Sequence, residues 1–253
     1  MSGNRPRAFR GPRARRLSAG LGAARIAATA LISTATLMGS AAMAGPARTA
    51  PLPMALPHPM ARPAPLAATM VARLNHAGYK HKRHCTATLV ARDLALTAAH
   101  CLGGVPLAEH HILPGYERGR ADQNLRPNGR VLRFGARDVA AIAISPAHDG
   151  AVIRTVGEPQ VGDTAWVQGY PMPAREIQTS LACPVLRVKP HHFLLKCTVA
   201  PGGSGAPVVH RTPGGPVLIG VISRRKGGAT LAERLPPRLR AHIRAANQQR
   251  RQR

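Results

Sequence analysis

The chain has 253 residues, and its 36 lysine and arginine residues against 10 acids give a formal net charge of +26. A charge of this size attracts polyanions and anionic surfaces, but it says nothing about the fold. Three Phe, three Tyr and one Trp are too few for base-stacking surfaces, so the composition argues against specific nucleic-acid recognition.

Residues 1–44 have the pattern of an export signal. Seven arginines and no acid occupy residues 1–25, an apolar run extends from Ile26 to Met43, and Ala42-Met-Ala44 is a small-x-small cleavage site. The alternative is an uncleaved membrane anchor, because the run is near the lower length limit for crossing a bilayer. We expect cleavage, and a protein that is periplasmic or secreted.

The next segment, 45–75, is predicted to be a linker or pro-segment, because it is rich in proline and lacks apolar periodicity. Residues 76–248 then form one folded domain, which is long enough to bury a core. A short basic tail, 249–253, ends the chain.

Four cysteines bracket two predicted hairpins. Cys85 and Cys101 enclose strand-like runs at 86–91 and 94–98, and Cys183 and Cys197 enclose runs at 184–188 and 192–196. An antiparallel hairpin brings its ends together, and an even number of cysteines in an exported chain favours disulfides. Metal binding is the competing interpretation, which the absence of any C-x₂-C pair disfavours.

Three short segments carry residues suited to nucleophilic catalysis. His100 ends the run Leu-Thr-Ala-Ala-His-Cys, and Ser204 lies in Gly-Gly-Ser-Gly-Ala-Pro, where the glycines allow a sharp turn. Asp138 opens the apolar run Val139–Ile144, where a carboxylate is costly unless it is paired. Six other histidines stand among polar residues and are expected at the surface: His81, His84, His110, His111, His191 and His192.

These segments, in this order, resemble the signatures of the trypsin-like serine protease family over residues 83–245. The resemblance implies that Ser204 is the nucleophile, His100 the general base and Asp138 the acid that orients it, with Asp149 as the alternative acid. It implies an oxyanion hole at the backbone N–H groups of Gly202 and Ser204. It also places a family disulfide at the first cysteine pair.

Short β-rich runs with glycine and proline between them indicate an all-β fold. The resemblance implies two antiparallel β-barrels of the chymotrypsin-like kind. His100 and Asp138 come from the first barrel and Ser204 from the second, and a C-terminal helix covers 236–247.

The substrate pocket is expected at Thr198, Ser223 and Arg224. Thr198 stands six residues before Ser204, at the base of the family's primary pocket, and Val217–Ser223 resembles the strand that lines the cleft. A neutral threonine favours small-to-medium apolar or uncharged side chains. The cations that follow, Arg224 to Lys226, either favour acidic substrates or are ordinary surface charge.

The predicted function is therefore an exported serine endopeptidase that acts on protein or peptide substrates through an acyl-enzyme. The alternative is an inactive scaffold that binds anionic envelope surfaces or polyanions. An α/β-hydrolase is disfavoured because its residues run Ser, acid, His. Gly203 replaces an aspartate of zymogen-activated members, so activation by N-terminal insertion is not expected. Neither cofactor nor metal is implied, and we expect a monomer.

Overall fold

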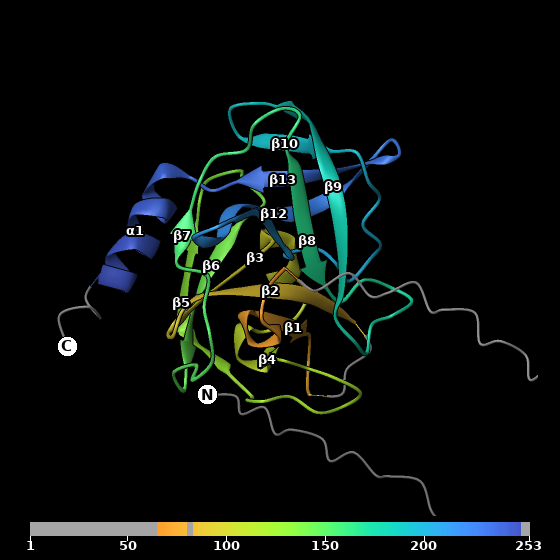
Figure 1. The fold of residues 1–253 in the computed structure, drawn as a ribbon. Coiled ribbons are helices and arrows are strands. Elements are labelled where there is room, and N and C mark those ends of the chain that lie inside the picture. Colours follow the sequence, from red (N-terminus) through yellow and green to blue (C-terminus); the bar gives the residue numbers. More distant parts are fainter. Residues whose placement is uncertain (1–64, 80–82, 249–253) are drawn as a thin grey trace, which may run out of the picture. The chain divides into compact units, whose positions relative to one another are not determined.

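The computed structural model describes residues 65–79 and 83–248, and two largely antiparallel sheets carry most of them (Figure 1). The first sheet has the strand order β4-β1-β2-β3-β6-β5, and a backbone bridge between Ile112 and Leu125 closes it into a barrel. Its strands are β1 Val71–Asn75, β2 His84–Ala91, β3 Leu94–Thr97, β4 His111–Pro114, β5 Arg126–Arg133 and β6 Ala140–Ser145.

The second sheet has the order β11-β8-β9-β10-β13-β12-β7, with an additional pairing between β11 and β12. It is more open than the first, because β11 meets β8 only at Val208 and Val209. Its strands are β7 Thr155–Val156, β8 Thr164–Gly169, β9 Thr179–Val188, β10 His192–Leu195, β11 Pro207–Thr212, β12 Gly215–Lys226 and β13 Ala229–Arg234. The all-β fold predicted from the sequence is confirmed.

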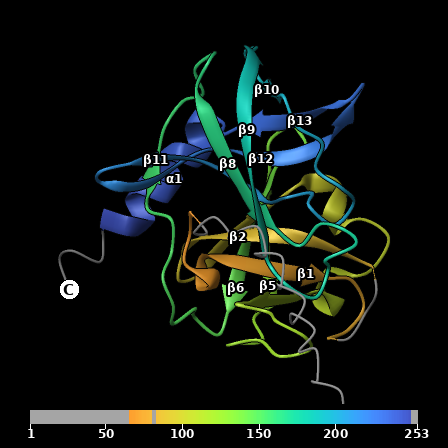
Figure 2. The ribbon, with the colours of Figure 1, turned by 45° about the vertical axis from the view of Figure 1, so that its right-hand side comes forward.

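The core divides into three clusters because successive side chains of a strand face opposite sides of a sheet. On β3, Ala95 faces the interior of the first barrel, whereas Leu94 and Leu96 join a cluster with residues of the second barrel. Leu239 and Ile243 of helix α1, Pro237–Gln248, are buried in that shared cluster. The helix thus packs where the two sheets meet (Figure 2).

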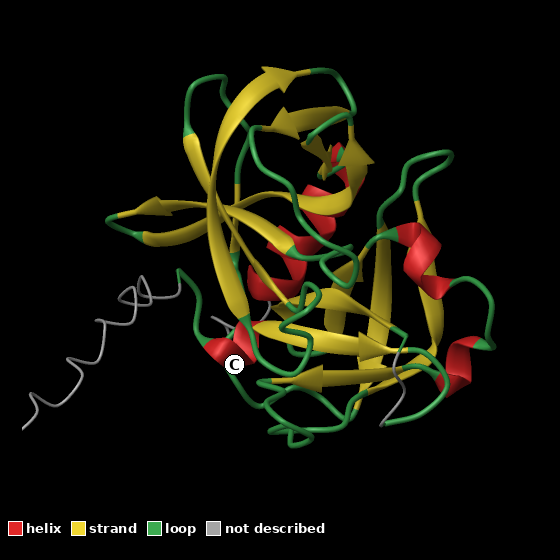
Figure 3. Cartoon of the chain, turned by 90° about the vertical axis from the view of Figure 1, so that its right-hand side faces the viewer, coloured by secondary structure: helices red, strands yellow, loops and turns green. Residues whose placement is uncertain are grey.

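Both predicted hairpins are present as β2–β3 and β9–β10. Disulfides join Cys85 to Cys101 and Cys183 to Cys197, and each closes one hairpin. The remaining helices of the described chain are short turns, seen in red in Figure 3. They are η1 Ala68–Met70, η2 Ala99–Leu102 and η3 Leu107–Glu109.

The start of the folded domain differs from the prediction. The sequence analysis places residues up to 75 in a linker, but Val71–Asn75 forms β1, which lies between β4 and β2 with all five residues buried. Leu66 is buried as well. The polar residues Arg73 and Asn75 obscure the strand in the sequence, and they are accommodated by a hydrogen bond to each other.

The predicted export signal 1–44, most of the predicted linker and the tail 249–253 lie outside the described residues. Among the described helices, none is long and apolar enough to cross a membrane.

Candidate active site

The residues predicted as base and acid meet where β3 ends and β6 begins, next to the paired residues Thr97 and Ala140. His100 lies in the 3₁₀ turn η2, directly after β3, and half of its side chain is exposed. Asp138 stands just before β6. Its Oδ2 lies 2.8 Å from His100 Nδ1, and its Oδ1 accepts the backbone N–H of His100 at 2.9 Å. The carboxylate therefore fixes both the ring and the backbone of the histidine.

A third donor completes the environment of Asp138. The hydroxyl of Ser223, on β12 of the second barrel, donates to Asp138 Oδ2 at 2.5 Å. Burial acts to raise the pKa of Asp138, but the hydrogen bonds from His100 and Ser223 outweigh it and lower the pKa to about 2. Asp138 is thus ionised at neutral pH, which places the proton of His100 on Nδ1 and leaves Nε2 as an acceptor.

Ser204 lies in the turn between β10 and β11, and its hydroxyl is bonded away from His100. Its hydroxyl donates to the backbone oxygen of Ser223 at 3.1 Å, and the described residues include no hydrogen bond between Ser204 Oγ and His100. Cys101 Sγ lies 3.7 Å from His100 Nε2 and 3.9 Å from the backbone oxygen of Ser204. The disulfide therefore sits against both residues and keeps their two segments adjacent.

The turn around Ser204 is shaped by glycine. Gly202 and Gly205 have φ values of +92° and +82°, which L side chains rarely adopt. A Cβ at Gly205 would lie 2.1 Å from the backbone oxygen of Thr86, and one at Gly203 would lie 2.3 Å from Val199 Cγ1. A side chain at either position would therefore require the turn to shift.

The backbone of this turn leaves two donors available. Gly203 N–H and Gly205 N–H donate to the oxygens of Ala200 and Ile222. The N–H groups of Gly202 and Ser204, by contrast, donate to no acceptor within residues 65–79 and 83–248. Two unengaged donors in one glycine-rich turn can stabilise a developing oxyanion.

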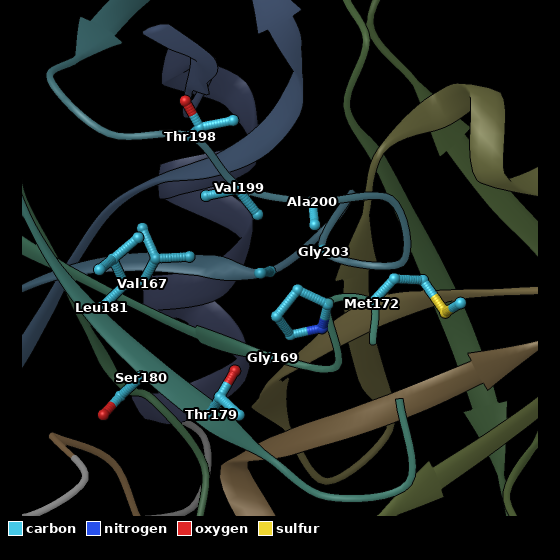
Figure 4. A pocket seen from close by; sticks show the side chains of 12 residues that line it. Val167, Gly169, Met172, Thr179, Ser180, Leu181, Thr198, Val199, Ala200 and Gly203 are labelled. Carbon is cyan, nitrogen blue, oxygen red and sulfur yellow. The ribbon is translucent and has the colours of Figure 1, made fainter. Parts of the chain in front are cut away.

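A cavity of about 230 Å³ adjoins the same turn (Figure 4). Thr198 lines it, as do residues of β8 and β9, and no lining side chain is charged. The lining residues are Val167, Gly169, Pro171, Met172, Thr179, Ser180, Leu181, Thr198, Val199, Ala200, Gly203 and Ala206.

The other two predicted pocket residues lie elsewhere. Ser223 is fully buried against Asp138 instead of lining this cavity, because its hydroxyl is held by the carboxylate. Arg224 is exposed on β12 and does not line the cavity. The contact of Ser223 with Asp138 was therefore missed by sequence reasoning. Its only signal is a polar residue at the end of the apolar run Val217–Ile222.

Two further predictions concern histidine and metal sites. His84 and His110, expected at the surface, are buried; His84 Nε2 bonds the backbone oxygen of Tyr170, and His110 Nε2 that of Cys101. In the described part of the chain, the only group of potential metal ligands joins His100 to Cys85 and Cys101. These cysteines form a disulfide and offer no thiolate, so the group does not suit a metal.

Two antiparallel barrels, with a His–Asp pair on one and a glycine-flanked serine on the other, define the chymotrypsin-like class of fold. The family described as trypsin-like peptidase domain matches residues 85–221, more than half of the chain, and the chain belongs to this family. It has a serine protease fold.

Solved structures are similar at low sequence identity. A Glu endopeptidase in complex with MPD has 18% identity and a TM-score of 0.58, with 71% of this chain and 90% of that chain covered. A scabies mite inactivated protease paralogue has 15% identity and a TM-score of 0.57, with 71% and 94% covered. At these identities the likeness shows the fold alone. No curated protein matches the chain.

Proposed function

We propose that this protein is an exported serine endopeptidase that hydrolyses peptide bonds through an acyl-enzyme. The observation that supports it best is the bond between His100 Nδ1 and an ionised Asp138, beside a serine turn with two unengaged N–H groups. A base held in one tautomer, a nucleophile and an oxyanion site are the three requirements of this chemistry.

The reaction begins when Ser204 leaves the carbonyl of Ser223 by rotation about χ1 and turns to His100. Its oxygen attacks the carbonyl carbon of the substrate while its proton passes to His100 Nε2. Asp138 stays ionised and stabilises the imidazolium. The oxyanion accepts hydrogen bonds from Gly202 and Ser204.

The peptide C–N bond then breaks, and the leaving amine takes the proton from His100. A water molecule next gives a proton to Nε2 and attacks the acyl carbon. Breakage of the ester bond returns the proton to Ser204 and releases the acid. Thr198, by resemblance, forms the base of the pocket for the side chain beside the cleaved bond, with no metal or cofactor involved.

Export is the second part of the proposal. Residues 1–44 act as the signal and are removed, and the protein acts in the periplasm or outside the cell. The two disulfides support this, because such bonds persist in oxidising compartments. The peptidase domain then begins close to residue 65 and ends near residue 248.

Labelling of the exported protein with a fluorophosphonate tests the chemistry, because this probe reacts with a serine activated by a base and an oxyanion hole. We expect labelling of the wild type and none of Ser204→Ala or His100→Ala. Wild-type protein that is folded and has both disulfides, yet is not labelled, would contradict the proposal.

One observation favours a second candidate, an inactive scaffold that binds polyanions. The hydroxyl of Ser204 bonds Ser223 and not His100, which is the arrangement of a resting or unused nucleophile. Salt-sensitive binding to heparin, unchanged by Ser204→Ala in a protein that is not labelled, would support this candidate.

A further inference from the structure

Strand β12 continues beyond the candidate site as three consecutive cations. Ser223, whose backbone oxygen accepts the Ser204 hydroxyl, is followed by Arg224, Arg225 and Lys226, which are all exposed. We refer to these three residues as the β12 cations. They occupy the end of the strand next to the turn at Gly227 and Gly228.

The β12 cations lack a counter-charge within the described chain. None of the three forms an ion pair with another described residue. The four acids that follow β7 are engaged elsewhere: Glu158 with Arg234 and Arg240, Asp163 with His210, Glu176 with Arg175, and Glu233 with Arg137. We therefore expect the β12 cations to bind an acidic ligand.

The same end of β12 has one free edge. Pairing with β11 ends at Val221, and β7 pairs only with Val217 and Leu218. From Ser223 to Lys226, β13 occupies one edge, and among the described residues no strand occupies the other. An extended peptide can add to such an edge through backbone hydrogen bonds.

We place the added strand antiparallel to β12, as β11 and β13 are, because antiparallel pairing is the more stable per residue. Such a peptide runs from the Lys226 end toward Ser223 and so brings the bond to be cut to Ser204. Its residues N-terminal to that bond then lie along the β12 cations. Electrostatic attraction would act on this part of the substrate and not on the part beyond the bond.

The cations are distributed over both faces of the sheet. Arg225 pairs with Thr230, whose hydroxyl bonds the backbone of Cys197 and Val199, so Arg225 is on the face toward the segment that leads to Ser204. Arg224 and Lys226 are on the opposite face, because side chains alternate along a strand. Acidic side chains on either face of an added peptide therefore meet a cation.

We propose that the β12 cations select peptide substrates with acidic residues at the second to fourth positions N-terminal to the cleaved bond, beyond the residue that enters the uncharged pocket. This inference rests on the proposed peptidase function and names its substrate class. It differs from a general attraction by the net charge, because it assigns the preference to one strand and to one side of the cleaved bond.

The first experiment measures binding, so that it does not depend on hydrolysis. Fluorescein-labelled peptides that differ only in Glu or Gln at three successive positions are titrated against the full exported chain carrying Ser204→Ala. We expect the Glu peptide to bind about five- to tenfold more tightly at moderate salt, the effect of two exposed ion pairs. Arg224→Gln/Lys226→Gln should reduce the difference to about twofold, the part due to the remaining Arg225, and Arg224→Glu/Lys226→Glu should reverse the preference.

The matched control removes the same charge from helix α1. Arg238 and Arg244 are exposed and form no ion pair within the described residues, so Arg238→Gln/Arg244→Gln should leave the preference for Glu unchanged. Equal binding of the two peptides, or an equal loss in both double variants, would overturn the proposal.

The second experiment locates the preference relative to the cleaved bond. Wild-type enzyme digests a peptide library, and the cleaved sites should be enriched in Asp and Glu on the N-terminal side. Enrichment on the C-terminal side only would overturn the assigned direction. Acidic peptides that bind through β12 to a protein without fluorophosphonate labelling would instead count against the proposed peptidase function, and would leave the recognition surface in place.

Discussion

The two barrels hold their parts of the candidate site by different means. In the first barrel, polar side chains do this: Asp138 accepts hydrogen bonds from the ring and the backbone of His100, and from Ser223 across the interface. In the second barrel, the backbone does it: Ser204 lies in a turn whose glycines have no room for a Cβ. We therefore expect activity to depend on side-chain chemistry in the first barrel and on backbone shape in the second.

The largest effect expected in the first barrel comes from Asp138→Asn. Its amide would face two donors, the His100 ring and the Ser223 hydroxyl, so the ring proton would move to Nε2 and block its role as base. We expect the labelling rate to fall about 10⁴-fold, together with a loss of about 2 kcal/mol in the free energy of unfolding, which the ionised carboxylate contributes. Asp149→Asn is the matched control, because Asp149 is exposed and pairs with Arg92. An equal loss in that variant would contradict the assignment.

The matching change in the second barrel is Gly205→Ala. The new Cβ would lie 2.1 Å from the oxygen of Thr86 at a φ of +82°, so the turn must move. We expect a loss of more than about 3 kcal/mol in the free energy of unfolding, measured with urea, together with loss of labelling. Gly227→Ala, at φ +54° in open space, should cost only about 1 kcal/mol and leave labelling intact.

The two disulfides allow a direct comparison of the barrels, because they close loops of similar size, with sequence separations of 16 and 14. Replacing either pair by serine should cost about 3 kcal/mol of stability. Only the loss of Cys85–Cys101 should also slow labelling, because Cys101 touches His100 and the backbone of Ser204. Equal labelling rates in the two folded variants would remove this difference between the barrels.

The smallest effect expected is the acid sensitivity of the first barrel. The pKa of Asp138 is about 2 against an ordinary value of 3.8, so its ionised form stabilises the fold above pH 4, and this stabilisation is lost as the pH falls toward 2. The loss should be about 2 kcal/mol in urea unfolding. Ser223→Ala removes one hydrogen bond that lowers this pKa, so its loss over the same range should be smaller. An identical dependence of stability on pH in the wild type and in Ser223→Ala would contradict this role of Ser223.

The sequence predicts the parts of the fold that local patterns specify. The hairpins between the paired cysteines and the helix at the C-terminus are present nearly as expected, because apolar runs and turn residues mark their limits. β1 was missed because the partners that make Arg73 acceptable in a buried strand, Asn75 and the ring of Tyr116, are recognisable only in three dimensions.

The site shows the same limit. The types and order of His100, Asp138 and Ser204 follow from the sequence, whereas the contact between Ser223 and Asp138 joins residues 85 positions apart. His110 was expected at the surface because its neighbours in the chain are polar. It is buried because its ring nitrogens reach backbone carbonyls that the fold places around it.

The spacing of the ten acids along this chain bears on whether the protein cleaves itself. No two of them lie within four residues of each other, and most are tied to arginine or histidine in the folded domain. The proposed selection by the β12 cations favours substrates in which acids lie close together in the chain, and this chain contains no such cluster. We therefore expect little self-cleavage in concentrated samples of the protein.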